Sequence, residues 1–246
     1  QGGRFEQTPT HSLCVDPLSG PVPAFELLVG NEIKLTTGEL KVTVSLSPFS
    51  ISVHRTDGSV VFETFAGETY STLNDAWVQR RKIGKNDPIF GLGEKSGSHN
   101  RRGRDFTLWN TDVLNPTATG EFVSALESDD PRSDQTSVEF DPYYISIPFF
   151  YHQDAATSKM AGSFIDNSYR GYYDFSQEDS YLIHFAGGEY NEYVFAGPSM
   201  SQVLHHYTWL TGRMALPPIW ALGYHHCRWQ PYLQQDVENL VAKHRA

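Results

Sequence analysis

The sequence has little cysteine, no long apolar run and no excess of basic charge, and each shortage excludes a class of protein. The two cysteines, Cys14 and Cys227, fit no metal spacing and cannot build a disulfide framework, so we interpret them as plain buried thiols. The mean hydropathy is −0.43 and no segment approaches the roughly 18 apolar residues of a membrane helix, so we expect no membrane span. A net charge of −10 argues against a nucleic-acid partner.

Motifs for a metal ion or a nucleotide are also missing. The glycine-rich segment FGLGEKSG at residues 90–97 carries serine where the third glycine of a dinucleotide fingerprint would stand, and it lacks the P-loop Gly-Lys-Ser/Thr. We interpret its glycines as allowing a tight turn and close strand packing. The histidine pair at 225–226 does not converge on one point, because adjacent strand residues face opposite sides, and we interpret the pair at 205–206 as ordinary surface and core histidines of a predicted helix. We therefore predict no metal site and no cofactor, and we read the basic run at 101–104 as a charged turn.

Short stretches with strand periodicity fill most of the chain. Val42, Val44 and Leu46 alternate with polar residues, and Asp57-Gly58 is a strong hairpin turn signal between two apolar runs. Further strands are expected at 144–151, 161–165, 181–185 and 190–195. Many short strands separated by Gly, Asp and Pro predict an antiparallel β-sandwich, which we assign to residues 1–196.

The last fifty residues follow another pattern. Residues 197–215 predict a linking helix, with a start at 197–199 and a stop at Gly212. Residues 216–246 predict one βα unit, in which the apolar run 219–227 is the strand and residues 233–246 the amphipathic helix. One strand and one helix cannot bury each other's apolar faces, so we expect a second chain or a further segment to complete this fold.

The segment 121–141 is strongly acidic, with seven Asp or Glu residues against Arg132 alone. We interpret it as a solvated surface loop, with a loop that overhangs a substrate cleft as the alternative.

Four motifs occur together in order. They are FGLGE at 90–94, LWNTD at 108–112, IPFF at 147–150 and ALPPIWALGYHHCRW at 215–229. In this order and spacing the chain resembles glycoside hydrolase family 31, the α-glucosidase and α-xylosidase family, from about residue 90 onwards. The resemblance implies a mainly β fold in which an N-terminal antiparallel β-sandwich is followed by the first strand and helix of a (β/α)8 barrel.

The resemblance also implies substrate-binding residues. Trp229 would lie at the barrel rim and line the subsite for the non-reducing sugar, and Asp112 would hydrogen-bond substrate from a sandwich loop. Trp229 could instead be a capping core aromatic, and Asp112 a turn or N-cap residue. The family's two catalytic aspartates belong to later barrel strands, and neither motif occurs here, so no residue of this chain is expected to be catalytic.

The implied function is the N-terminal part of a retaining, exo-acting α-glycosidase. The leading prediction is an α-glucosidase that hydrolyses terminal α-linked glucose, with transfer of that glucose as an additional activity. The alternatives within the family are an α-xylosidase, an α-glucan lyase or a transglycosylase. A noncatalytic carbohydrate-binding β-sandwich is the alternative from another class. The expected partners are a C-terminal chain with the rest of the barrel and both catalytic aspartates, and an α-glucoside oligosaccharide. Similarity to secreted fungal members that are cleaved into two associated chains implies secretion.

Overall fold

The computed structural model describes residues 10–111, 121–123, 139–227 and 230–246. The chain divides into two compact units, Gln1–Gly212 and Arg213–Ala246, called here the sandwich unit and the C-terminal unit. Within the described residues, no helix combines the length and apolar character needed to cross a membrane.

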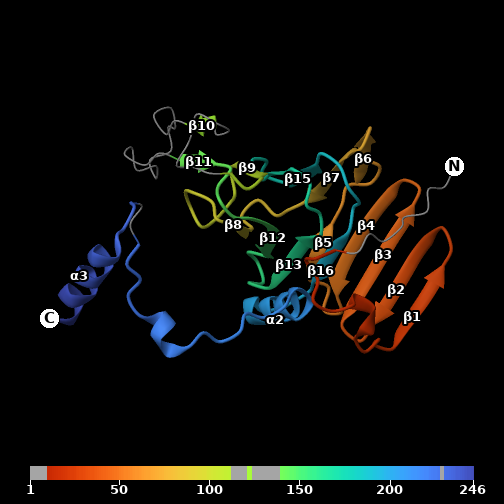
Figure 1. Cartoon of the computed structure of the whole chain (residues 1–246). Helices are drawn as coiled ribbons and strands as arrows, with labels where there is room; N and C mark the ends of the chain where they lie inside the picture. The colour runs from red at the N-terminus through yellow and green to blue at the C-terminus, as the bar shows by residue number, and fades with distance from the viewer. Residues whose placement is uncertain (1–9, 112–120, 124–138, 228–229) are drawn as a thin grey trace. The chain divides into compact units, whose positions relative to one another are not determined.

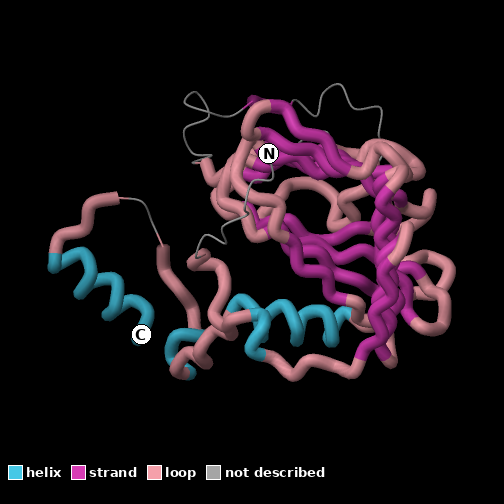
Figure 2. The backbone as a smooth tube through the Cα atoms, turned by 90° about the vertical axis from the view of Figure 1, so that its right-hand side faces the viewer, coloured by secondary structure: helices cyan, strands magenta, loops and turns pink. Residues whose placement is uncertain are grey.

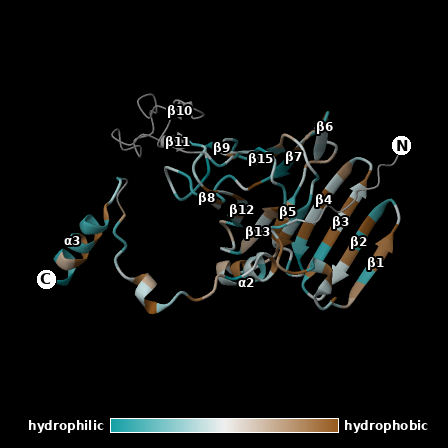
Figure 3. Ribbon diagram, in the orientation of Figure 1, coloured by the Kyte–Doolittle hydropathy of each residue, from teal (hydrophilic) through white to brown (hydrophobic). Residues whose placement is uncertain are grey.

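The sandwich unit begins with a five-stranded antiparallel sheet (Figure 1). Its strands are β1 (Phe25–Val29), β2 (Glu32–Thr37), β3 (Leu40–Leu46), β4 (Phe49–Arg55) and β5 (Val60–Glu63), paired in sequence order after the short 3-10 helix η1 (Pro17–Ser19). Asp57-Gly58 forms the β4–β5 turn, where Gly58 has a φ of +86° and the Asp57 carboxylate accepts a 2.9 Å hydrogen bond from the Ser59 N–H. The predicted hairpin is therefore confirmed. Apolar and polar bands alternate along these strands (Figure 3), as expected for a sheet with one covered face.

Two further antiparallel sheets enclose the main core (Figure 2). One contains, in spatial order, β6 (Tyr70–Leu73), β7 (Ala76–Lys82), β15 (Ser180–Phe185), β14 (Gly171–Asp174) and β9 (Asp105–Leu108). The other contains β16 (Glu192–Phe195), β13 (Met160–Ile165), β12 (Ser146–Gln153) and β8 (Ile89–Gly93), and a separate hairpin pairs β10 (Glu121–Val123) with β11 (Glu139–Asp141). Buried residues from both sheets, including Trp77, Phe150 and Ile183, form one cluster. The predicted antiparallel β-sandwich is thus confirmed.

Strand β12 shows how alternation builds two cores. Phe150 points into the cluster between the sheets, while its neighbour Phe149 packs on the opposite face beneath helix α2 (Met200–Thr211). The Tyr207 ring of α2 stacks on Phe149 with centroids 4.1 Å apart. Gly162 leaves the space for this helix, because a Cβ there would lie 2.5 Å from Val203 Cγ1.

Helix α2 lies within the predicted range 197–215. Ser199 is its N-cap and exchanges hydrogen bonds with Gln202, and Gly212 follows the last turn with a φ of +96°. The start and stop signals are confirmed, and the helix belongs to the compact unit of the sandwich.

The C-terminal unit contains the predicted helix but not the predicted strand. Helix α3 (Gln234–Arg245) matches the expected amphipathic helix. Residues Ile219–Leu222 instead form the 3-10 helix η3, and 223–227 have no regular structure. A strand needs a neighbour to receive its backbone hydrogen bonds, and the described part of this unit offers none. The assignment of 216–246 to the start of a barrel stays a prediction.

The interpretation of the cysteines as buried thiols is wrong. Both are exposed, since Cys14 lies on a coil segment beside the end of α2 and Cys227 on the irregular stretch before α3. The Cys14 thiol donates a 3.1 Å hydrogen bond to the Thr211 carbonyl.

Candidate functional site

Both predicted substrate-binding residues, Asp112 and Trp229, lie outside the described residues. Their roles therefore stay predictions. The structure does describe the chain up to Thr111, and so it shows how the approach to Asp112 is held.

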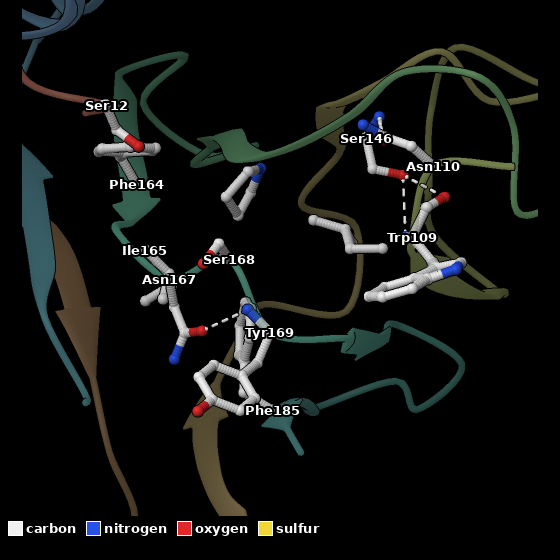
Figure 4. A pocket seen from close by; sticks show the side chains of 12 residues that line it. Ser12, Trp109, Asn110, Ser146, Phe164, Ile165, Asn167, Ser168, Tyr169 and Phe185 are labelled. Atoms are coloured by element: carbon white, nitrogen blue, oxygen red, sulfur yellow. Dashed lines mark hydrogen bonds between the residues drawn. The ribbon is translucent and has the colours of Figure 1, made fainter. Parts of the chain in front are cut away.

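The end of β9 is fastened to the start of β12. The Ser146 hydroxyl accepts a hydrogen bond from the Trp109 N–H and donates one to the Trp109 carbonyl, each at 3.1 Å. The Asn110 side-chain oxygen accepts a 2.7 Å bond from the Ser146 N–H, and the Thr111 N–H donates to the Tyr143 carbonyl at 3.0 Å. Each of the three residues before Asp112 is thus tied to the segment 143–146, and Figure 4 shows the bonds of Trp109 and Asn110 to Ser146.

An open pocket of about 390 Å³ lies beside this junction (Figure 4). Its lining includes Trp109, Asn110, Ser146, Pro148, Asn167 and Tyr169. The Trp109 and Tyr169 side chains are 47% and 56% exposed, so their rings are accessible. Aromatic faces beside a few polar groups are a usual composition for a small-molecule site.

Asn167 holds the backbone at Tyr169. Its side-chain oxygen accepts a 2.8 Å hydrogen bond from the Tyr169 N–H, while its NH₂ group donates to the carbonyls of Gly187 and Glu189. The Gly187-Gly188 turn is thereby held against the Tyr169 loop.

A buried ion pair lies behind the pocket wall. The Lys95 ammonium is fully buried and lies 3.3 Å from the Asp141 carboxylate. It also donates to the Thr107 carbonyl at 2.6 Å and to the Ser146 hydroxyl at 3.3 Å. Burial lowers the pKa of Lys95 from its ordinary value, and the nearby Asp141 carboxylate opposes that change. Sequence reasoning missed this pair, because only the fold brings positions 95 and 141 together.

Asp141 was included in the predicted acidic loop. Its side chain is 15% exposed, and its second oxygen accepts a 2.6 Å hydrogen bond from the Thr107 N–H. For Asp141 the solvated-loop interpretation is therefore wrong, while the other acidic side chains of 121–141 lie outside what the structure describes.

The glycines of the FGLGE segment act as predicted. Gly91 and Gly93 have φ values of +127° and +78°, and a Cβ on either would lie 2.6 Å from a backbone oxygen, that of Phe149 or Ile145. The basic run that follows is not merely a charged turn. Arg101 is buried and donates to the carbonyls of Gly91, Ser96 and Ser98.

Among the described residues, no group of His, Cys, Asp or Glu side chains is arranged to hold a metal ion.

Comparisons with known proteins agree with this architecture. The family profile for the glycosyl hydrolase 31 N-terminal galactose mutarotase-like domain matches residues 1–124. The chain is 33% identical over 212 residues to alpha-glucosidase 2 of Bacillus thermoamyloliquefaciens, covering 85% of this chain and 24% of that protein. It is 28% identical over 209 residues to the alpha-xylosidase XylQ of Lactiplantibacillus pentosus, covering 82% and 24%.

The fold has solved counterparts. A GH31 dextranase from Flavobacterium johnsoniae, solved with isomaltotriose, superposes with a TM-score of 0.81 at 24% identity over 99% of this chain and 27% of that one. The chain spans about a quarter of the length of these relatives. The chain belongs to glycoside hydrolase family 31, and it corresponds to the N-terminal portion of the family's enzymes.

Proposed function

We propose that this chain is the N-terminal part of a retaining, exo-acting α-glycosidase that hydrolyses terminal α-linked glucose. In this proposal the chain supplies the sandwich, the loop with Asp112 and the first barrel elements with Trp229. Both catalytic aspartates belong to the remainder of the enzyme, so this chain alone is inactive. Transfer of glucose to another sugar, and secretion of the enzyme, are part of the same proposal.

The observation that carries the proposal is membership of the family, together with a 33% identical α-glucosidase relative. The exposed apolar side chains of the C-terminal unit support the proposal that the remainder of the enzyme binds tightly to this chain. Leu216 and Trp220, for example, are 92% and 78% exposed. Large contiguous apolar surfaces are uncommon on isolated proteins.

The pocket beside Trp109 is compatible with a sugar ligand. Sugar rings present C–H faces to aromatic rings and hydroxyl groups to amides, and the pocket offers both kinds of partner. This observation also fits the second candidate, a noncatalytic carbohydrate-binding sandwich, which does not account for residues 216–246.

An α-xylosidase is the competing activity within the family, favoured by the 28% identical relative of that name. A xylose ring lacks the hydroxymethyl group of glucose. The choice therefore depends on the subsite around Trp229 and on barrel residues beyond this chain.

Activity assays separate these candidates. Residues 1–246 alone, the remainder alone and the two together should be tested on aryl α-glucoside and aryl α-xyloside. We expect turnover of the glucoside only when both parts are present. Turnover by residues 1–246 alone would contradict the assignment of catalysis elsewhere, and binding of maltose without any turnover by the complete protein would favour the noncatalytic sandwich.

A further inference from the structure

The Lys95–Asp141 pair is buried at the edge of a sheet that ends beside the pocket. Strand β9 is the last strand of its sheet and pairs with β14 on one side. On its other side, the Thr107 N–H donates to Asp141 and the Thr107 carbonyl accepts from Lys95, both at 2.6 Å. The two side chains therefore supply the hydrogen bonds that a further strand would otherwise make with this edge.

The same pair reaches the pocket wall through Ser146. Lys95 donates to the Ser146 hydroxyl, which in turn bonds both backbone groups of Trp109, and the Ser146 N–H donates to Asn110. A short series of hydrogen bonds thus connects the buried ammonium to the two residues that line the pocket before Asp112.

We propose that Lys95 and Asp141 are positioning residues for the substrate, because they fix the end of β9 and with it Trp109 and Asn110, which line the pocket. This inference rests on the proposed function. Neither residue would touch the sugar. Both would act by setting where the binding groups lie.

Stability alone is a poor reason to bury these charges. Removing an ammonium and a carboxylate from water costs more than a single 3.3 Å ion pair readily returns, so the ion pair by itself adds little stability. A buried charged pair does, however, fix geometry, since its hydrogen bonds admit few arrangements. At Thr107 that geometry controls the backbone that leads to the pocket residues Trp109 and Asn110.

The test replaces both charges at once in the complete enzyme, as Lys95→Met with Asp141→Leu. We expect a folded protein with a lower melting temperature, because the Thr107 N–H and carbonyl lose their partners, and with KM for the α-glucoside raised about tenfold to a hundredfold. Amide hydrogen exchange at Thr107, Trp109 and Thr111 should become faster. The matched control is Arg81→Met, a buried cation elsewhere in the sandwich unit, which should lower the melting temperature and leave KM unchanged.

A double-mutant cycle with Trp109→Ala distinguishes positioning of the pocket from a general loss of stability. If the pair acts through Trp109, replacing both charges should raise KM far less in the Trp109→Ala background than in the wild type. Unchanged KM and unchanged exchange at Thr107 in the Lys95→Met, Asp141→Leu variant would overturn the inference. An inactive wild-type enzyme would instead contradict the proposed function, and the exchange measurement would still decide whether the pair fixes β9.

Discussion

Two helices of twelve residues each, α2 and α3, behave differently in this chain. In α2, Val203 is fully buried and Leu210 is 3% exposed, because the helix lies on the sheet that contains β13 and β16. In α3, Val237 and Val241 stay 48% and 43% exposed, and no residue is buried. Both helices carry an apolar stripe, so the difference lies in the neighbour and not in the helical pattern. Most helix stability in proteins comes from packing such a stripe.

The same contrast extends to the two units. The described part of the sandwich unit contains three clusters of buried residues, whereas residues 213–246 expose Met214, Leu216, Ile219 and Leu222 by 68% or more. An apolar sequence without a covering surface is incomplete as a folding unit, which agrees with the proposal that further barrel segments pack against it.

Loss of a buried charge in the sandwich unit should give the largest effect. Arg81 and Glu192 form an ion pair with side chains 1% and 5% exposed, joined by Gln79 and the Tyr190 hydroxyl. Arg81→Met should lower the free energy of unfolding by about 3–5 kcal/mol, because Glu192 is left buried without its partner. Urea denaturation measures this.

The control is Arg245→Met at the exposed end of α3, which should change stability by less than about 0.5 kcal/mol. Equal effects at the two positions would mean that the C-terminal unit is folded as tightly as the sandwich.

One substitution made in both helices tests the contrast directly. Val203→Ala should cost about 1.5–3 kcal/mol, since it removes a fully buried side chain that touches Gly162. Val237→Ala should cost less than about 0.5 kcal/mol in the 246-residue chain. In the complete enzyme the cost at Val237 should rise toward that at Val203 if barrel segments cover α3, and thermal denaturation of both forms would show whether it does.

The sequence predicted most of the sandwich because its signals are local. Alternation, the Asp57-Gly58 turn and the Gly212 stop each act within a few residues, and the structure has each where it was expected. The prediction of a strand at 219–227 was wrong for the opposite reason. Its apolar run needs a neighbouring strand, which no local pattern provides.

The candidate site was only partly predictable. The motif around Trp109 and Asn110 indicated a binding loop, but the support for that loop comes from Lys95, Asp141 and Ser146, which are distant in sequence. Arg101 gives the same lesson, since a basic run does not reveal that one of its members is buried against backbone carbonyls.

Low pH should lower the folding stability of the sandwich unit, because Asp87 becomes protonated. Burial opposes ionisation of this carboxylate, but hydrogen bonds from His152 and from the Ala155 and Gly84 N–H groups outweigh it, so the pKa of Asp87 is lowered. A lowered folded-state pKa means that the stabilisation is present above the unfolded pKa, about 3.9, and is lost as the pH falls through the folded value.

Asp87→Asn should therefore cost about 1–3 kcal/mol at pH 7 and flatten the loss of stability below about pH 4. Chemical denaturation at pH 7 and pH 3 compares the two proteins. An identical pH dependence in wild type and variant would contradict the role assigned to Asp87.

The smallest expected effect on stability comes from changing the N-cap residues of the two helices. In α2, Ser199 accepts from the Gln202 N–H at 3.3 Å, and Gln202 accepts from the Ser199 N–H at 3.1 Å. In α3, Asp236 accepts from the Leu233 N–H at 3.0 Å, but the Leu233 side chain cannot accept a bond in return. Ser199→Ala should thus cost about 1 kcal/mol, and Leu233→Ser should stabilise α3 by a similar amount in the 246-residue chain.

Whether Leu233→Ser stabilises or destabilises the protein should depend on what covers the helix. Its side chain is 76% exposed in this chain, so a serine loses no packing and gains a cap. In the complete enzyme, a barrel segment lying over Leu233 would make the same change destabilising, because buried leucine contributes more than a cap does. NMR chemical shifts of residues 234–245 report the helicity, and thermal denaturation of the complete enzyme reports the packing. A gain in stability in both the 246-residue chain and the complete enzyme would show that Leu233 stays exposed when the rest of the enzyme is present. The contrast between α2 and α3 would then persist in the complete enzyme.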